Sequence, residues 1–130
     1  MSCDRLAGNN WGRARLIFDD VANSETDADI VLNAPNENGV FTGNFRDPVS
    51  GEDLEDQLTN GLCRPNGLRS RVVFTRKHHG VNIITRYVGS VIPVNGATTV
   101  MIRGKFTRAT TEADGAVTIA SGDYETEKPT

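Results

Sequence analysis

The sequence predicts an all-β protein that folds as a single antiparallel up-and-down β-barrel of about eight strands. Apolar and polar residues alternate with a period of two along most of the chain, which is typical of half-buried strands. Short separators that end in glycine lie between the alternating segments, and glycine supplies the positive φ that tight hairpins need. Closing the sheet into a barrel removes its exposed edges. A β-sandwich is the alternative, since it would show the same alternation.

We expect a strand in each alternating segment. In order, these segments are residues 13–18, 29–34, 40–46, 68–77, 81–92, 98–108 and 116–125. The turns with a terminal glycine are Asn36–Gly39, Lys77–Gly80, Pro93–Gly96 and Glu112–Gly115. The inward positions predict a barrel interior made of Leu16, Phe18, Ile30, Leu32, Phe41, Phe45, Val72, Phe74, Ile83, Tyr87, Val100, Ile102 and Phe106. The in-strand glycines Gly43, Gly89 and Gly104 suit the bends of a small barrel.

One short stretch looks helical rather than extended. Ser50 followed by Asp53 resembles a capping box, and Leu54 and Leu58 lie one helical turn apart. We therefore expect a turn or two of helix between two strands.

The chain is long enough for one domain, so we expect residues 1–130 to form a single barrel domain. The polar tail from about residue 126 is expected to fray. The first residues contain no apolar leader region, and no apolar run is long enough for a membrane helix. Either the protein is cytosolic, or Met1 replaces a removed leader. Cys3 and Cys63 permit one disulfide at most, and free thiols in a reducing compartment are the alternative.

Charge is unevenly distributed along the sequence. The segment Arg64–Arg108 holds nine of the 14 basic residues and none of the 17 acidic ones. Acidic loops beside these strands would cancel the positive field; otherwise the basic face meets an anionic partner or the acidic surface of another subunit. Nucleic acid is disfavoured by the net charge of −3 and by the small number of aromatic residues available for stacking.

The outward positions of the basic strands are partly apolar. Val73, Ile84, Val88, Ile92 and Met101 share this side with Arg86 and Arg103. A mixed surface of apolar side chains and arginine is typical of subunit interfaces. We therefore expect a homo-oligomer, either a dimer or a tetramer.

The sequence contains no recognisable catalytic motif, and we expect neither a catalytic residue, a metal site nor a cofactor. His78 and His79 are adjacent in a predicted turn, where neighbouring side chains point apart and chelate poorly. The acidic residues 47–56 lack the spacing of a calcium loop. Arg64 beside Cys63 could lower a thiol pKa, but no general base is evident.

Three segments resemble the avidin and streptavidin family. Gly39–Phe45 is similar to that family's Gly-x-Leu/Phe-Thr-Gly-x-Tyr strand. Cys3–Trp11 is similar to its Leu-x-Gly-x-Trp opening with one extra residue, and Gly122–Thr126 is similar to its closing Gly-x-Asp-x-Phe-Thr strand with one residue fewer. The resemblance is best over the first third and the last tenth of the chain. It implies an eight-stranded barrel that self-associates.

The family binds biotin through several tryptophans and a tyrosine hydroxyl, and this chain departs from that pattern. Trp11 is its single tryptophan, and Phe45 stands in the position of the tyrosine. Arg13 aligns with the family's small polar residue after the first turn, and Asp123 aligns with its final carboxylate. The departures argue against biotin as the ligand.

The leading functional hypothesis is a non-enzymatic barrel that holds a small ligand at its mouth. The candidate contacts are Trp11, Phe45, Phe74, Tyr87 and Asp123, although the aromatic ones would serve equally well as core. Two alternatives stay open. One is a barrel enzyme of the cyclase or isomerase type acting on a hydrophobic substrate, and the other is a solid structural or interaction barrel. We expect no membrane partner.

Overall fold

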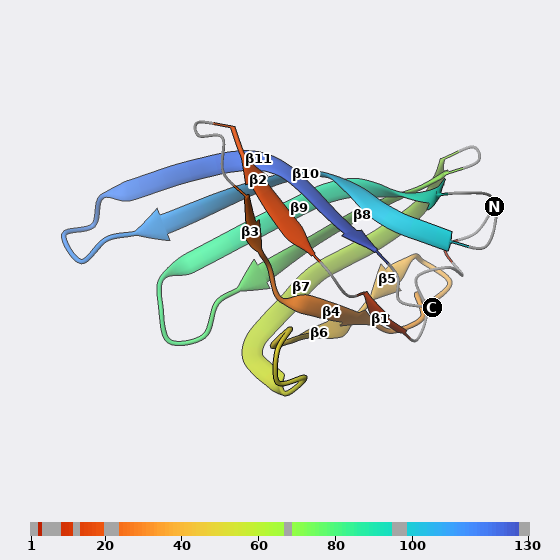
Figure 1. Ribbon diagram of the computed structural model, residues 1–130, viewed down its shortest axis with the longest axis horizontal. Coiled ribbons are helices and arrows are strands. Elements are labelled where there is room, and N and C mark those ends of the chain that lie inside the picture. The colour runs from red at the N-terminus through yellow and green to blue at the C-terminus, as the bar shows by residue number, and fades with distance from the viewer. Residues whose placement is uncertain are drawn as a thin grey trace.

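A computed structural model describes residues 3, 9–11, 14–19, 24–66, 69–94 and 99–127 of the chain (Figure 1). These residues form eleven strands and contain no α-helix, so none of their segments is a helix able to cross a membrane. The strands are β1 (Asn9–Trp11), β2 (Arg15–Phe18), β3 (Ser24–Thr26), β4 (Asp29–Leu32), β5 (Val40–Phe41), β6 (Gly43–Arg46), β7 (Asp53–Asn66), β8 (Arg69–Lys77), β9 (Ile83–Val94), β10 (Thr99–Thr111) and β11 (Val117–Glu127).

All eleven strands belong to one antiparallel sheet that closes on itself. The hydrogen-bonded path runs from β4 through β6, β7, β8, β9, β10, β11 and β2 to β3. Only Asp27 and Ala28 separate β3 from β4, so both ends of this path lie on the same chain segment. β1 pairs with β4 and β5 pairs with β7. The predicted up-and-down barrel is therefore confirmed, and a sandwich of two sheets is excluded.

The barrel interior consists largely of the predicted residues. Those that are buried as expected are Leu16, Ile30, Leu32, Phe41, Phe45, Val72, Phe74, Tyr87, Ile102 and Phe106. Phe18 and Ile83 are only partly buried, and the side chain of Val100 lies outside the described residues. The core also contains Ala14, Ala28, Cys63, Val91 and Tyr124.

Large rings fit in this small interior because glycines lie beside them. Phe74, Tyr87, Phe106, Gly122 and Phe18 are successive cross-strand partners from β8 to β2. Phe74 stacks on Tyr87 with 4.6 Å between ring centroids, and Phe18 meets Phe106 edge-on at 5.3 Å. A Cβ on Gly122 would lie 3.0 Å from the Phe106 ring, closer than packed atoms normally approach. Gly122 therefore leaves the space that the ring of Phe106 occupies next to β11.

The expected helix after Ser50 is wrong, because residues 53–66 form β7. Leu54 and Leu58 do share a face, but positions four apart do so in a strand as well as in a helix. In the first half of β7, Leu54, Asp56 and Leu58 are the less exposed positions, and the residues between them face solvent. The turn before β7 is stabilised locally, since the Asp47 carboxylate accepts hydrogen bonds from the backbone of Val49 and Ser50.

The two cysteines form a disulfide between Cys3 and Cys63. This bridge joins the start of the chain to the inward face of β7, where Cys63 is 1% exposed. The strand β11 extends to Glu127, and Thr126 is fully buried.

Candidate functional site

Charged side chains enter the barrel at one end. In an up-and-down barrel alternate turns lie at the same end, which here carries the turns 47–52, 78–82 and 112–116. Arg76 is close to this end on β8, and it shares the inward face of that strand with Val72 and Phe74. Its exposed fraction is 8%, which is rare for a charged residue unless it is paired. Its partners therefore decide how this end of the barrel is organised.

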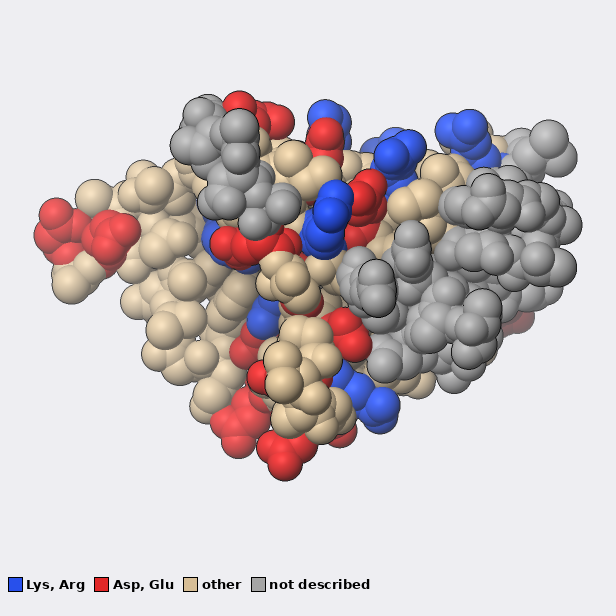
Figure 2. All heavy atoms as spheres, in the orientation of Figure 1, with Lys and Arg blue, Asp and Glu red and all other residues tan. Residues whose placement is uncertain are grey.

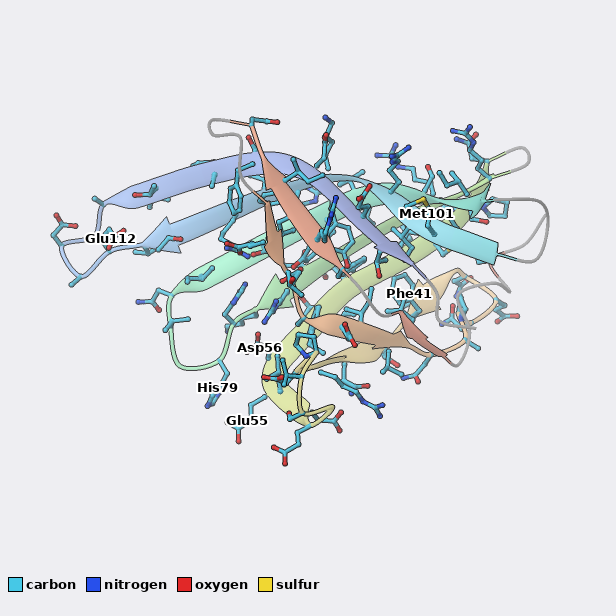
Figure 3. All side chains as sticks on the ribbon, viewed as in Figure 1. Phe41, Glu55, Asp56, His79, Met101 and Glu112 are labelled. Atoms are coloured by element: carbon cyan, nitrogen blue, oxygen red, sulfur yellow. A yellow bond between two sulfur atoms is a disulfide. The ribbon has the colours of Figure 1, made fainter. Side chains whose placement is uncertain are left out.

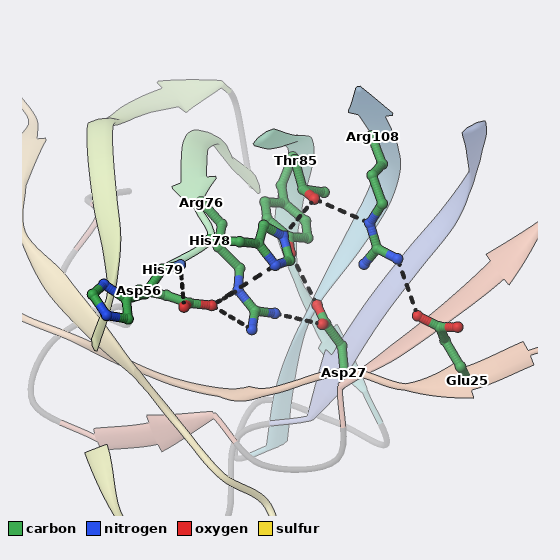
Figure 4. A network of polar contacts seen from close by, with 9 residues as sticks. Glu25, Asp27, Asp56, Arg76, His78, His79, Thr85 and Arg108 are labelled. Atoms are coloured by element: carbon green, nitrogen blue, oxygen red, sulfur yellow. Dashed lines mark hydrogen bonds and ion pairs between the residues drawn. The ribbon is translucent and has the colours of Figure 1, made fainter. Parts of the chain in front are cut away.

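Arg76 lies between two carboxylates, the buried Asp27 and the partly buried Asp56 (Figure 4). Its Nε donates to Asp56 Oδ2 at 2.6 Å, and its Nη1 donates to Asp27 Oδ1 at 2.8 Å. The guanidinium also lies 4.9 Å from the centre of the Phe45 ring, a favourable cation–π distance. Burial alone would lower the pKa of Arg76, but the adjacent Asp27 and Asp56 raise it above its usual value. The arginine therefore stays charged inside the barrel.

The carboxylate of Asp27 also connects this charge to the aromatic core. Tyr87 donates its hydroxyl hydrogen bond to Asp27 Oδ2 at 3.0 Å. Burial and the negative charge of Asp27 raise the pKa of Tyr87 far above its usual value, so the phenol stays protonated. Tyr124 packs against Tyr87 with 4.6 Å between ring centroids. Its buried hydroxyl has no hydrogen-bond partner among the described residues.

A second group of polar side chains continues the cluster toward solvent (Figure 4). The hydroxyl of buried Thr85 lies 3.0 Å from His78 Nε2 and accepts from Arg108 Nε at 3.2 Å. The Nη1 of Arg108 donates to Glu25 at 3.2 Å. Burial and the nearby charge of Arg76 lower the pKa of His78 to about 4, so its ring is neutral at pH 7. We call Glu25, Asp27, Asp56, Arg76, His78, Thr85 and Arg108 the mouth cluster.

A cleft of about 360 Å³ lies next to the mouth cluster. It is lined by Glu55, Gln57, Lys77, His78, His79, Gly80, Val81 and Asn82. Figure 3 shows Glu55 and His79 projecting from this end, close to Asp56. His79 Nε2 lies 2.6 Å from Glu55 Oε2, and the His79 backbone N–H donates to Asp56 Oδ1 at 2.8 Å. His78 belongs to both the cleft and the mouth cluster, so a ligand in the cleft would contact the cluster through this residue.

The structure brings together some of the predicted ligand contacts but not all of them. Phe45, Phe74 and Tyr87 lie inside the barrel. Phe45 packs against Arg76 of the mouth cluster, Tyr87 is bonded to Asp27 of the cluster, and Phe74 stacks on Tyr87. Asp123 lies on the outer surface, where it pairs with Lys105, because its neighbours Gly122 and Tyr124 take the inward positions of β11. Trp11 belongs to β1, but its side chain lies outside the described residues.

Sequence reasoning missed Asp27, Asp56 and Arg76 as site residues. Arg76 is two positions after Phe74 and four after Val72, so the alternation of side chains along a strand puts it on the same inward face. Asp56 lies in the segment that we expected to be helical, so the alternation of a strand did not assign its side chain to the interior. Asp27 lies in the short break between β3 and β4, where no strand alternation applies. His78 does lie just beyond β8, as predicted, but it contacts the mouth cluster rather than only solvent. Among the described residues, no group of His, Cys, Asp and Glu side chains could hold a metal ion.

Comparison with known proteins supports the fold alone. No family model and no curated protein sequence matches this chain. Among solved structures, the chain is similar to AVR2, an avidin-related protein, with a TM-score of 0.66 and 15% sequence identity. The match covers 96% of this chain and 95% of that chain. The chain therefore has an avidin-like β-barrel fold.

The charge of Arg76 is predicted to be essential for stability. In an Arg76→Met variant, Asp27 and Asp56 would stay buried without a counterion. We expect the free energy of unfolding at pH 7 to fall by about 3–5 kcal/mol, measured by urea denaturation. Adding Asp27→Asn and Asp56→Asn should recover much of the loss, and Arg69→Met on the surface is the control. Equal stability of the Arg76 and Arg69 variants would contradict this assignment.

His78 is predicted to make stability depend on pH. Its pKa is about 4 in the folded protein against 6.5 for an unperturbed histidine, so the unfolded chain binds a proton first as the pH falls. The stabilisation that the neutral His78 gives to the folded protein is complete above pH 6.5 and is lost as the pH falls toward 4. We expect a loss of about 1–3 kcal/mol over this range. In His78→Gln, the unfolding free energy should fall less between pH 6.5 and 4, and an unchanged profile would refute the assignment.

Proposed function

We propose that this chain is a non-enzymatic binding protein that holds a small ligand at the end of its barrel that carries the mouth cluster. The buried ion pairs of Arg76 with Asp27 and Asp56 are the observation that carries this proposal. Burying three charges is costly, and an apolar set of similar volume would often be at least as stable. Polar groups that converge at the open end of a small barrel are typical of a ligand site.

The proposed ligand lies in the cleft of about 360 Å³ and contacts the outer members of the cluster. Arg108 does not line the cleft, but Thr85 contacts both Arg108 and the cleft residue His78, so a ligand that extends past His78 reaches it. The Arg108 side chain is 18% exposed, and its hydrogen bonds to Thr85 and Glu25 use only Nε and Nη1. The neutral ring of His78 offers a further polar contact. Phe45, Phe74 and Tyr87 form the packed floor beneath, so the ligand touches the edge of the aromatic core rather than displacing it.

A thermal-shift screen tests this proposal, because a ligand that binds only the native state raises the melting temperature. The screen uses a library of small polar and aromatic compounds that includes biotin. We expect at least one compound to raise the melting temperature, and Arg108→Gln to abolish that shift. Lys105→Gln on the outer face is the control that should keep it. A library without any stabilising compound, or a shift that survives Arg108→Gln, would contradict the proposed site.

Biotin is expected to give no shift in the same screen. The chain offers one tryptophan in place of the family's several, and Phe45 lacks the hydroxyl of the family's tyrosine. Each missing hydrogen bond or large aromatic contact costs about 1–3 kcal/mol of binding. Several such losses remove many orders of magnitude of affinity. Nanomolar biotin binding by calorimetry would overturn this expectation.

We also propose that the protein self-associates through the outer face of β8, β9 and β10. Val73 and Val88 are direct cross-strand partners there, and so are Ile92 and Met101. Ile84 is 49% exposed on the same face. Arg86 and Arg103 lie in the rows between these apolar pairs, so the surface combines apolar area with guanidinium groups.

Light scattering of the unmodified chain at micromolar concentration should report a dimer or a tetramer. Val88→Asp should dissociate it, because an unpaired charge at the centre of an interface is costly. Val40→Asp is a matched control, since Val40 is 48% exposed on β5, away from this face. A monomeric unmodified chain would refute the proposal, and so would equal dissociation by both variants.

The hydroxyl of Tyr124 favours a second candidate function, a barrel enzyme of the cyclase or isomerase type. It is buried next to Tyr87, which is itself bonded to Asp27, and it has no hydrogen-bond partner in the part of the chain that the structure describes. Protonated phenols beside a carboxylate are groups that can donate protons to a substrate. Turnover of a compound found in the screen, lost in Tyr124→Phe, would identify the enzyme; binding without turnover supports the carrier.

A further inference from the structure

Three arginines at one end of β7 and β8 have no carboxylate partner. Arg64 on β7 and Arg71 on β8 are direct cross-strand partners, and Arg69 is two residues from Arg71. All three are exposed, and among the described residues none of them forms an ion pair. We call Arg64, Arg69 and Arg71 the arginine row. Figure 2 shows basic side chains projecting along the upper edge of the molecule, toward the end where β7 and β8 meet.

The arginine row differs from four of the six other basic residues of the segment Arg64–Arg108, and the remaining two, Lys77 and Arg86, are single exposed charges that form no ion pair among the described residues. Arg76, Arg103, Lys105 and Arg108 each have an acidic partner, as expected if acidic segments neutralise the basic strands. Like charges placed directly opposite each other on a sheet destabilise it. Cross-strand partners are about 5 Å apart, and positions two apart on a strand are separated by about 7 Å. Three guanidinium groups at this spacing can contact successive acidic groups of one linear molecule.

A cleft of about 250 Å³ adjoins the arginine row, since Arg64 is one of its lining residues. Its other walls come from the Cys3–Cys63 disulfide, two prolines and the turn at residues 36–39. Pro35 and Pro65 present apolar ring surfaces, and Asn38 presents an amide. Glu37 also lines the cleft and adds a carboxylate that can accept hydrogen bonds from sugar hydroxyls. Flat apolar surface next to amide and carboxylate groups suits the ring of an uncharged sugar unit, with the acidic groups of the chain directed to the arginines.

The cleft is built by ordered backbone contacts rather than by loose side chains. Asn36 Oδ1 accepts hydrogen bonds from the backbone N–H groups of Asn38 and Val40. Gly39 has a φ of 81°, and its carbonyl accepts from the Cys63 N–H at 2.8 Å. A Cβ on Gly39 would collide with the Cys63 carbonyl oxygen. The turn is therefore held against β7 before any ligand arrives, which reduces the entropy lost on binding.

We propose that this end of the barrel binds an acidic polysaccharide, a linear chain of sugars that bears sulfate or carboxylate groups. The arginine row binds the acidic groups, and the adjoining cleft receives one sugar ring. Guanidinium forks match sulfate and carboxylate oxygens in pairs. Single-stranded nucleic acid fits less well, because the exposed large apolar residues of the described chain include no aromatic side chain on which bases could stack.

Arg64 and Arg69 lie beside the surface proposed for self-association, whereas Arg71 shares the cross-strand row of Ser90 and Arg103 and so lies at the border of that surface. Its apolar pairs lie on β8, β9 and β10, whereas Arg64 lies on β7 and Arg69 lies at the first position of β8. The net charge of the chain is −3, so the molecule as a whole repels polyanions at neutral pH. Any binding to such a chain must then come from a local basic surface.

Binding of a defined heparin hexasaccharide, measured by calorimetry at several NaCl concentrations at pH 7.5, tests the proposal. We expect binding at 50 mM NaCl. The logarithm of the binding constant should fall linearly with the logarithm of the NaCl concentration, with the slope of about three ionic contacts. Arg64→Gln and Arg71→Gln should each weaken binding at least about tenfold at 50 mM NaCl and reduce the salt slope by about one contact. Lys77→Gln is the matched control, because it removes one positive charge at the opposite end of β8. It should leave the affinity within about twofold, as expected for a single exposed charge outside the contact.

Several outcomes would overturn the proposal. Absence of hexasaccharide binding at 50 mM NaCl would do so, and so would equal weakening by Lys77→Gln, since the effect would then be general electrostatics. If single-stranded DNA of the same charge bound with equal affinity, the site would recognise negative charge and not an acidic polysaccharide, and the proposal would be wrong. If light scattering shows that the Arg64 and Arg71 variants dissociate an oligomer and hexasaccharide binding is unchanged, the arginine row belongs to a contact between copies.

Discussion

A guanidinium inside a β-barrel has to be neutralised where it lies, and in this protein Asp27 and Asp56 neutralise Arg76. The two carboxylates come from different parts of the barrel wall. Asp27 lies in the break between β3 and β4, and Asp56 lies on β7. Arg76 therefore joins β8 to both. The same charge lies over the Phe45 ring and contributes to keeping His78 neutral. The aromatic packing and the polar contacts at this end depend on that arrangement.

The aromatic layer below Arg76 separates two chemically different ends of the barrel. Phe74 and Tyr87 stack at its centre, and Tyr87 is the one member of this stack that reaches a charged group, Asp27. On the other side lie aliphatic side chains and the buried sulfur of Cys63. One end thus presents paired charges beside a cleft, whereas the other presents three arginines, beside a second cleft, that form no ion pair among the described residues. These different environments support two separate binding proposals on one small fold.

Much of the fold could be predicted from sequence, because period-two alternation and glycine turns are local signals. The alternation of inward and outward positions alone correctly predicts that Phe74 and Tyr87 lie inside the barrel. The same alternation places Arg76 inside, but a charged residue is assigned to solvent unless its partners are known, and Asp27 is 49 residues away. Leu54 and Leu58 fit both strand and helix, so only pairing with β6 and β8 decides their structure. The disulfide also depends on a contact over 60 residues that spacing does not reveal.

Hydrogen exchange of the Arg76 Nε–H, followed by nitrogen-15 NMR, tests the central claim most directly. A proton that is buried and donated to Asp56 should exchange with water at least about a hundredfold more slowly than the Nε–H groups of the exposed Arg69 and Arg71. Its signal should also move in Asp56→Asn while those of Arg69 and Arg71 stay in place. An Arg76 Nε–H that exchanges as fast as theirs would show that the guanidinium is solvated, and the account of this barrel end would then fail.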